Sequence, residues 1–321
     1  MVTKLCLVGA GSIGRRHLKL LLEREDVALC VAEPREKCKA AVKEICADLP
    51  IYDSMAEAVK AEGCEAVIIA TPHGMHAKMA IEALQMGMHV FCEKPMSDSM
   101  EECVQMLKAA QASDKVFSVG FMFRFDPFVM KVKEIIESGK IGNIVHYSSR
   151  FATYNTLLCS VTKHQENTPY SLVMDCIHDS DLLYHFTGRI PDYAYSVAYK
   201  AGDMPLSSPQ NFIDTVYRWE DKSMGAHVHF NYVQHPQIHD LQIVGDKGYI
   251  LGDFMSADVT VGSREGTKET IVNTRSCIGS DFNNVYRSEW NEFLRAIRGE
   301  RKAENPPEQA IVSTLLMHSQ I

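Results

Sequence analysis

The stretch Gly9-Ala10-Gly11-Ser12-Ile13-Gly14 organises the beginning of the chain. It follows Lys4–Val8, an apolar run typical of a β-strand, and precedes Arg15–Leu22, which is predicted to form a helix. The first glycine permits a tight turn, the second lets the backbone approach a pyrophosphate, and the third lets helix and strand pack closely. The amides at the start of a helix also favour a bound anion. The stretch therefore predicts a dinucleotide site; the alternative is a glycine turn that binds nothing.

An acidic residue stands where a dinucleotide-binding turn needs one. The predicted strand Val27–Ala32 is followed by Glu33, roughly twenty residues beyond the glycines. A carboxylate at this place accepts hydrogen bonds from both ribose hydroxyls of NAD and repels the 2′-phosphate of NADP. The nearby Arg35 has the chemistry to accommodate that phosphate. We therefore expect NAD as the cofactor and keep NADP as the alternative.

Length and composition place the sequence among ordinary globular proteins of about two domains. Its 321 residues are 46% hydrophobic and 23% charged, with a formal net charge of −8. The sequence shows no basic stripe for nucleic acid, no apolar run long enough to span a membrane and no signal-peptide core. We therefore expect a cytoplasmic protein that binds neither nucleic acid nor membranes.

Neither the cysteines nor the histidines predict a metal site. The ten cysteines are scattered without a Cys-x-x-Cys pair, so reduced, buried thiols are the better interpretation. His227 and His229 share one face of a predicted strand, but no carboxylate or cysteine joins them at a ligand spacing. We therefore expect no bound metal.

Strands alternate with helices throughout residues 1–122. This alternation predicts a doubly wound parallel sheet of the Rossmann type, in which ligands bind outside the carboxyl ends of the strands. The expected strands are Leu5–Val8, Val27–Ala32, Ile51–Tyr52, Ala66–Ala70, His89–Cys92 and Val116–Gly120.

Chemically useful groups follow two of these strands. After the fourth come Thr71, Pro72, His73 and, at the start of the next helix, His76. The proline makes the turn rigid and offers a rim for a nicotinamide ring, whereas the histidines have an alternative role as solvent-exposed helix caps. After the fifth strand comes Glu93-Lys94-Pro95. A lysine fixed there beside a carboxylate is suited to catalysis, the alternative being a solvated surface lysine.

Together these motifs resemble those of the Gfo/Idh/MocA family, named for glucose–fructose oxidoreductase, inositol dehydrogenase and rhizopine catabolism. The motifs that carry the resemblance are Gly9 to His17, Ala70-Thr71-Pro72, His76, Glu93-Lys94-Pro95 and Gly120 to Pro127. It implies a nicotinamide-dependent oxidoreductase with a Rossmann domain over residues 1–122. Residues 123–321 would then form an α/β domain for substrate binding and oligomerisation, with a large, mostly antiparallel open sheet and C-terminal helices able to pack back on the first domain.

The resemblance also assigns roles to residues. The family's catalytic lysine corresponds to Lys94, and Arg124 is expected to contact the substrate. The residues expected to bind the cofactor are Gly9, Gly11, Ser12, Ile13, Gly14, Glu33, Arg35, Thr71, Pro72, His73, His76, Glu93 and Lys94.

A second group of candidate catalytic residues lies in Asp175-Cys176-Ile177-His178-Asp179-Ser180-Asp181. In a helix, the three-residue spacing places Asp175, His178 and Asp181 near one face. A histidine flanked by carboxylates is suited to proton transfer near neutral pH, and a capped helix with a satisfied histidine is the alternative. The family resemblance implies that Asp175 and His178 act with Lys94 on a substrate hydroxyl, commonly that of a sugar or amino sugar. Asp181 is expected to pair structurally.

Strands joined by short turns dominate residues 193–261 and predict an antiparallel sheet. One face of such a sheet packs on its own helices, and a partner subunit is the simplest cover for the other. The resemblance supports a homodimer or homotetramer formed through that face. The stretch 154–169 is irregular and polar, and is predicted to be a loop that contacts substrate.

The sequence therefore predicts an NAD-dependent dehydrogenase that transfers hydride between the cofactor and a hydroxyl or carbonyl of a sugar, amino sugar, nucleotide sugar or polyol. Two alternatives stay open. One is an NAD-dependent glycoside hydrolase of the same fold, and the other is a dinucleotide-binding regulator without catalytic activity.

Overall fold

The computed structural model describes residues 2–160, 164–168, 170–279 and 281–321. The chain forms two compact units, each with its own β-sheet. The first unit runs to Met122 and also includes Phe282–Ile311. The second unit consists of Phe123–Asp281 and Val312–Ile321.

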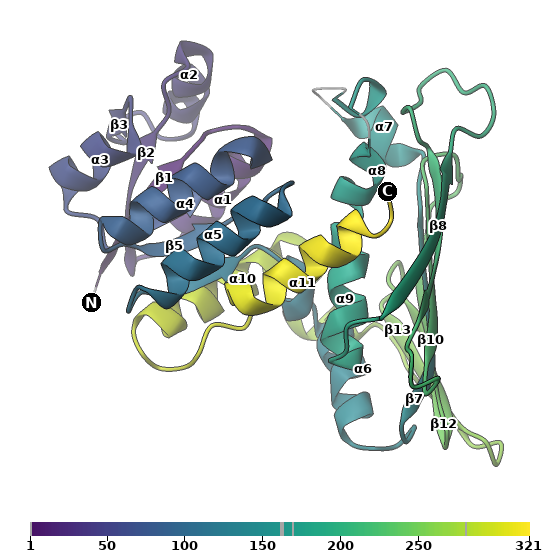
Figure 1. The fold of residues 1–321 in the computed structure, drawn as a ribbon. Coiled ribbons are helices and arrows are strands. Elements are labelled where there is room, and N and C mark those ends of the chain that lie inside the picture. The colour runs from purple at the N-terminus through teal and green to yellow at the C-terminus, as the bar shows by residue number, and fades with distance from the viewer. Residues whose placement is uncertain (1, 161–163, 169, 280) are drawn as a thin grey trace. The chain divides into compact units, whose positions relative to one another are not determined.

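The first unit is built on six parallel strands in the order β3-β2-β1-β4-β5-β6 (Figure 1). The strand order reverses between β1 and β4, and sheets of this kind bind ligands at such a reversal. The strands are β1 (Thr3–Val8), β2 (Val27–Ala32), β3 (Ile51–Tyr52), β4 (Ala66–Ile69), β5 (His89–Cys92) and β6 (Phe117–Val119). The helices are α1 (Ser12–Leu22), α2 (Glu36–Ile45), α3 (Met55–Glu62), η1 (His73–Met75), α4 (His76–Gln85), α5 (Met100–Gln111) and α10 (Asn283–Ile297).

Apolar packing fixes this sheet between helices. All four residues of β4 are buried, as expected for a central parallel strand that is covered on both faces. On one face, Leu5, Leu7 and Phe91 pack with residues of α1 and with Trp290 of α10 in a single buried cluster. The helices α4 and α5 pack against each other. The carboxyl edge of the sheet is thereby held rigidly, which is where the sequence predicts ligand contacts.

The second unit is built on eight strands in the order β14-β13-β12-β11-β7-β10-β9-β8. Only β7 and β10 pair in parallel among the described strand pairs of this sheet. The strands are β7 (Ile144–Ala152), β8 (Tyr193–Tyr199), β9 (Phe212–Arg218), β10 (Gly225–Asn231), β11 (Ile238–Gly245), β12 (Gly248–Asp253), β13 (Asp258–Ser263) and β14 (Lys268–Ile271). The helices are η2 (Met122–Phe125), α6 (Pro127–Glu137), α7 (Asn155–Cys159), η3 (His164–Glu166), α8 (Ser171–Asp175), α9 (Ile177–Thr187), η4 (Thr274–Ile278) and α11 (Pro307–His318), of which η2 and α11 cross the boundary between the units.

Helices cover one face of this sheet. In Figure 1, α6 and α9 lie along the same side of it, and α9 contacts β7. Along β9 the buried residues Ile213, Thr215 and Tyr217 alternate with side chains on the opposite face. We name that opposite surface the open face. The expected fold class, a Rossmann sheet followed by an α/β region with a mostly antiparallel sheet, is confirmed.

Two local expectations need correction. The stretch 154–169 is not wholly irregular, because it contains α7 and η3; residues 161–163 and 169 lie outside the described part of the chain. The segment 175–181 is not one helix either. Helix α8 ends at Asp175 and α9 begins at Ile177, with Cys176 between them at φ −90° and ψ 8°. The even three-residue spacing therefore does not by itself place Asp175 and His178 on one helical face.

Candidate functional site

The first unit brings its candidate residues to the carboxyl edge of the parallel sheet. The glycine turn follows β1, Glu33 follows β2, Thr71 follows β4, and Glu93-Lys94-Pro95 follows β5. Because all these strands are parallel, the segments that follow them emerge at the same edge. Chain order alone predicts this grouping.

The glycine turn has the shape that a pyrophosphate requires. A Cβ on Gly14 would lie 2.1 Å from the carbonyl oxygen of Gly9, so the helix start and the turn touch as backbone. Gly9 has φ +92°, a conformation that glycine adopts without strain. By contrast, a Cβ on Gly11 would meet nothing within 4 Å, which leaves space beside the first amides of α1. The residues present therefore fit a dinucleotide.

The Glu33 carboxylate is buried at the end of β2 and is held by several donors. It accepts the Ala10 amide at 2.8 Å, and the Arg35 side chain at 2.8 Å through both Nε and Nη2. Burial alone would raise the pKa of Glu33, but the hydrogen bonds from Arg35 and Ala10 outweigh it and lower the pKa to about 2. The Arg35 side chain is 58% exposed, so the carboxylate is fixed while its cationic partner is able to move.

The two histidines after β4 have different environments. His76 is buried, and its ring nitrogens lie 2.9 Å from the carbonyl oxygens of Pro95 and Thr71. Its ring therefore links the two turns that follow β4 and β5. His73 instead lies at the surface, 3.1 Å from a carboxylate oxygen of Asp98. Cofactor contacts by either histidine stay predictions.

The turn that carries Lys94 is anchored by its acidic neighbour. Glu93 is 7% exposed; one of its oxygens lies 2.6 Å from Nε2 of His17, and the other accepts the Lys94 amide at 3.1 Å. The indole N–H of Trp290 lies 3.1 Å from Nδ1 of His17. His17 belongs to the motif that begins with the glycine turn, but its position in that motif gave it no role in the sequence analysis.

The second unit positions Asp175 and His178 at the junction of α8 and α9. The Asp175 carboxylate accepts a hydrogen bond from the Tyr232 hydroxyl at 2.5 Å and another from the Gln165 amide at 3.0 Å. The His178 ring lies beside the Phe123 ring, with 4.7 Å between their centroids. Sequence reasoning missed Tyr232, Gln165 and Phe123, because no local pattern reveals which distant residues will surround a given side chain.

The Arg124 side chain is held in a buried ion pair with Asp181. Its side chain is buried, and its guanidinium donates to both oxygens of Asp181, at 2.8 and 2.6 Å. Asp181 also accepts the Ser313 hydroxyl at 2.7 Å. The expected structural pairing of Asp181 is thus present, and a substrate contact by Arg124 stays a prediction.

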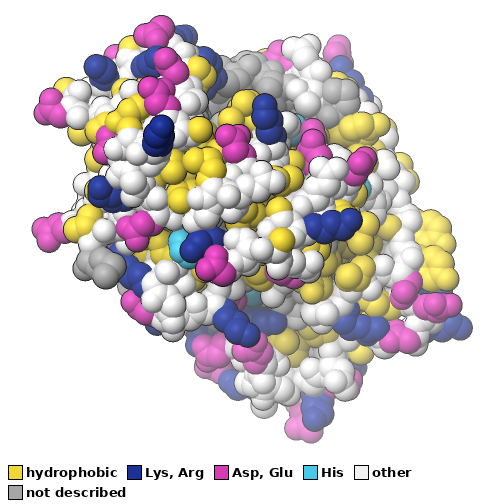
Figure 2. All heavy atoms as spheres, turned by 60° about the vertical axis from the view of Figure 1, so that its left-hand side comes forward, with side chains coloured by type: hydrophobic (Ala, Val, Ile, Leu, Met, Phe, Trp, Pro, Cys, Tyr) yellow, Lys and Arg dark blue, Asp and Glu magenta, His cyan; other side chains and the backbone are white. Residues whose placement is uncertain are grey.

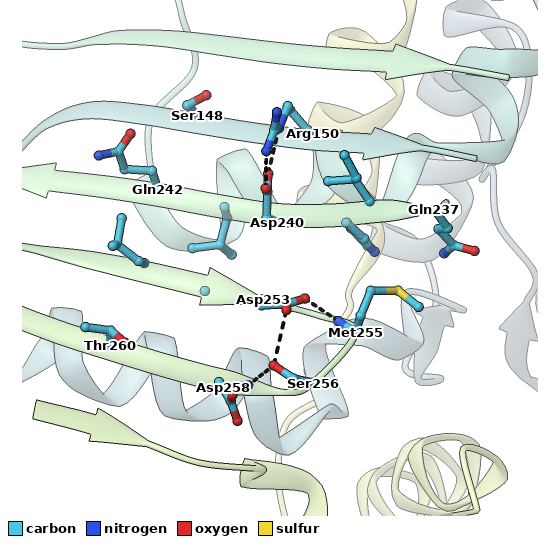
Figure 3. A pocket seen from close by; sticks show the side chains of 15 residues that line it. Ser148, Arg150, Gln237, Asp240, Gln242, Asp253, Met255, Ser256, Asp258 and Thr260 are labelled. Carbon is cyan, nitrogen blue, oxygen red and sulfur yellow. Dashed lines mark hydrogen bonds and ion pairs between the residues drawn. The ribbon is translucent and has the colours of Figure 1, made fainter. Parts of the chain in front are cut away.

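The open face of the second unit contains a shallow hollow of about 790 Å³. Figure 3 shows Arg150 and Asp240 paired between adjacent strands at one side of it, with Asp253 and Ser256 at its other side. These residues come from the strands β7, β11 and β12 and the turn after β12, far along the chain from either group of candidate catalytic residues. None of the predicted catalytic residues lines this hollow.

In the fold, His227 and His229 meet a carboxylate that their spacing in the sequence does not indicate. One oxygen of Asp214, on the neighbouring strand β9, lies 3.0 Å from His227 and 2.8 Å from His229. The strands pair antiparallel, which brings Asp214 opposite His229. Even so, the described residues contain no group of three or more histidine, cysteine or acidic side chains arranged to hold a metal ion.

Surface charge is mixed. Figure 2 shows basic and acidic side chains interspersed over the described residues of the face it presents, without a continuous basic patch there. Within the described ranges, no helix is both long and apolar enough to cross a lipid bilayer.

Comparison with known proteins matches both halves of the chain to one family. Residues 3–121 match the model for the NAD-binding Rossmann fold of the GFO_IDH_MocA oxidoreductase family. Residues 133–318 match the model for the C-terminal alpha/beta domain of the same family.

Individual relatives agree with this match. Inositol 2-dehydrogenase of Salmonella typhimurium is 30% identical over 189 residues, which cover 57% of this chain and 54% of that protein. The chain thus spans about half the length of that relative. The scyllo-inositol 2-dehydrogenase (NAD(+)) of Bacillus subtilis is 26% identical over 311 residues, covering 91% of this chain and 85% of the relative. The crystal structure of myo-inositol 2-dehydrogenase from Lactobacillus plantarum has the same fold, with a TM-score of 0.82, 22% identity and coverage of 99% and 96%.

Proposed function

Because the chain belongs to the Gfo/Idh/MocA oxidoreductase family, we propose that it is an NAD-dependent dehydrogenase acting on a hydroxyl of a polyol or sugar-like substrate. The observation that carries the proposal is the match of both family models to a chain whose Lys94 turn and glycine turn lie at one sheet edge. The long alignment with the scyllo-inositol dehydrogenase supports a cyclic polyol as the first substrate to test.

The first unit binds the cofactor in this proposal. The glycine turn and the start of α1 hold the pyrophosphate, and Glu33 accepts the ribose hydroxyls after Arg35 moves aside. Thr71, Pro72 and the Lys94 turn border the nicotinamide end. When bound there, NAD⁺ would supply the hydride acceptor for oxidation of the substrate alcohol to a carbonyl.

The chain's own groups handle the hydroxyl proton. Lys94 follows Glu93 directly and is suited to hold the substrate oxygen through a hydrogen bond. His178 accepts the hydroxyl proton as hydride leaves, so one proton and one hydride depart together from the alcohol. Asp175, fixed by Tyr232 and Gln165, orients the histidine or the substrate.

The test measures turnover with NAD⁺ and a panel of polyols and simple sugars that includes scyllo-inositol and myo-inositol. The absorbance of reduced nicotinamide is the readout. Lys94→Met and His178→Ala should each lower kcat about a hundredfold or more, because positioned acid–base groups contribute on that scale. Both variants should bind NAD within about twofold of wild type, and Lys108→Met on the surface of α5 serves as the control.

Three results would contradict this assignment. Full turnover in both variants removes the proposed roles of Lys94 and His178. Sugar release without net reduction of NAD indicates a glycoside hydrolase. NAD binding without turnover of any substrate indicates a regulator.

We further propose that two copies of the chain associate through the open face. Tyr195, Val197 and Val216 are 65%, 62% and 51% exposed on that face, which is unusual for large apolar side chains. We also propose that the protein works in the cytoplasm. None of the ten cysteines forms a disulfide, although the sulfurs of Cys30 and Cys64 are only 3.6 Å apart. Free thiols at this distance support a reducing compartment.

A further inference from the structure

A buried chain of side chains ends at the backbone of Lys94. Trp290 on α10 meets Nδ1 of His17 on α1, and Nε2 of His17 meets Glu93 at 2.6 Å. Glu93 in turn accepts the Lys94 amide. His17 is 0% exposed and Trp290 1%, so solvent does not compete for these bonds. Two helices thus reach the turn after β5 through three side chains.

Donor and acceptor chemistry fixes the tautomer of His17. An indole N–H is a donor only, so Nδ1 of His17 accepts and carries no proton. The ring proton is therefore on Nε2, where it is donated to Glu93, since an ionised carboxylate accepts only. The bond from Trp290 therefore defines both the tautomer and the orientation of the His17 ring.

Aromatic rings hold the imidazole of His17 in place. Its ring meets those of Phe91, Tyr286 and Trp290 edge-on, with centroid distances of 5.7, 5.7 and 5.1 Å. Edge-to-face packing of this kind favours one orientation. The imidazole therefore has little freedom to turn away from Glu93.

The pKa values of two carboxyl groups in this region are shifted in opposite directions. Burial would raise the pKa of Glu93, but the bond from His17 and the charge of Lys94 hold it below its ordinary value. Burial and the nearby Glu93 raise the pKa of Glu289, on α10, well above its ordinary range. Burial and its neighbours thus favour the ionised form at Glu93 over Glu289, and Glu93 also faces His76 of α4 and Tyr286 of α10.

We propose that His17 is a positioning residue: Trp290 fixes its tautomer, His17 fixes the Glu93 carboxylate, and Glu93 fixes the backbone from which the Lys94 side chain reaches the substrate. This inference rests on the proposed role of Lys94. Its mechanism is geometric, since a displacement of about 1 Å at a reacting group costs about a hundredfold in rate.

The first experiment compares His17→Gln and Glu93→Gln with wild type. Both should lower kcat about tenfold to a hundredfold with little change in substrate KM, and His17→Gln should bind NAD within about twofold of wild type. The rate at which an amine-directed acetylating reagent modifies Lys94, followed by mass spectrometry, should also change by at least about threefold. The matched control is His89→Gln, because His89 lies at the opposite end of β5 and accepts the Val116 amide there.

The second experiment removes only the indole N–H. Trp290→Phe keeps an aromatic ring but removes the donor that holds Nδ1 of His17. The pH profiles of kcat and of the Lys94 modification rate should then differ from those of wild type. Trp219→Phe makes the same change at the chain's other tryptophan, which is equally buried, and should leave both profiles as in wild type.

The outcomes separate this inference from the proposed function. If wild type oxidises no substrate, the dehydrogenase assignment fails, and the Lys94 modification rate alone decides the role of His17. If wild type is active but His17→Gln and Glu93→Gln keep its kcat and its modification rate, the inference is wrong and the assignment stands. If neither of those variants folds, Trp290→Phe decides: a profile identical to that of Trp219→Phe overturns the proposal.

Discussion

At Glu33, two partners compete for one carboxylate. Arg35 donates to both oxygens in the structure, and the ribose hydroxyls of NAD need the same acceptors. Hydrogen bonds from Arg35 and from the Ala10 amide lower the pKa of Glu33 to about 2, so the carboxylate stays ionised above about pH 4. The affinity for NAD should therefore be constant between about pH 5 and 8.

Arg35 is where cofactor preference can be changed by one substitution. Arg35→Gln should weaken NADP binding about tenfold, since an ionic hydrogen bond to phosphate is worth about 1.5–3 kcal/mol. It should leave NAD binding equal or tighter, because Glu33 loses a competitor. Isothermal titration with NAD⁺ and NADP⁺ measures both, with Lys43→Gln on α2 as the control. An equal loss for the two cofactors would show that Arg35 contacts a part they share.

At the scale of helices and strands, two bidentate Arg–Asp pairs in the second unit differ in burial. Arg124 and Asp181 are each 1% exposed in their side chains, whereas Arg150 and Asp240 are 51% and 34% exposed. Asp181→Asn should destabilise this unit by about 3–5 kcal/mol, because it leaves a buried charge without its counter-ion. Asp240→Asn should cost at most about 1 kcal/mol.

The measurement is urea unfolding followed by tryptophan fluorescence. Trp219 lies in the second unit and Trp290 in the first, so a Trp290→Phe background reports the second unit alone. Equal losses of stability in Asp181→Asn and Asp240→Asn would contradict the argument from burial.

Helix α9 also carries a group that makes stability depend on pH. Burial and the nearby Arg124 lower the pKa of His185 to about 3, despite the opposing charge of Asp181; Lys133 adds to the lowering. The unfolded chain takes up a proton near pH 6.5, whereas the folded chain does not until about pH 3. The free energy of unfolding should therefore fall as pH falls through this range, by up to about 1.4 kcal/mol per pH unit.

Replacing this histidine tests the linkage. His185→Gln should flatten the dependence of unfolding free energy on pH between about pH 6.5 and 4, while above about pH 7 its slope should match that of wild type. The readout is the urea midpoint from Trp219 fluorescence at each pH. An unchanged slope in the variant would assign the acid sensitivity to other groups.

Local patterns predicted most elements but not which partners they meet. Apolar runs identified strands such as Ala66–Ile69, and chain order placed Lys94 at the ligand edge. The contacts that complete the candidate site join residues distant in sequence. His17 meets Glu93 across 76 positions, and Tyr232 meets Asp175 across 57. Such pairings depend on sheet order and helix packing, which no short window of sequence contains.

At the scale of the whole molecule, the open face of the eight-stranded sheet sets the expected assembly. The edge strand β8 and its neighbour β9 place Tyr195 opposite Val216. The same face carries the Arg150–Asp240 pair and the cluster of Asp214 with His227 and His229. An apolar margin beside paired charges suits a self-complementary contact, in which the same patch is used twice.

Val216→Lys should break that contact. Under two-fold symmetry, one substitution introduces two charges into the interface, so the variant should sediment as a monomer where wild type sediments as a dimer or tetramer. Met130→Lys on α6 adds the same charge at a residue that is 56% exposed outside the sheet, and should keep the wild-type size. The urea midpoint reported by Trp219 should be the same in all three proteins in the Trp290→Phe background, which excludes misfolding of the second unit as the cause. A monomeric wild type, or a Val216→Lys variant of wild-type size, would show that the open face is not the interface.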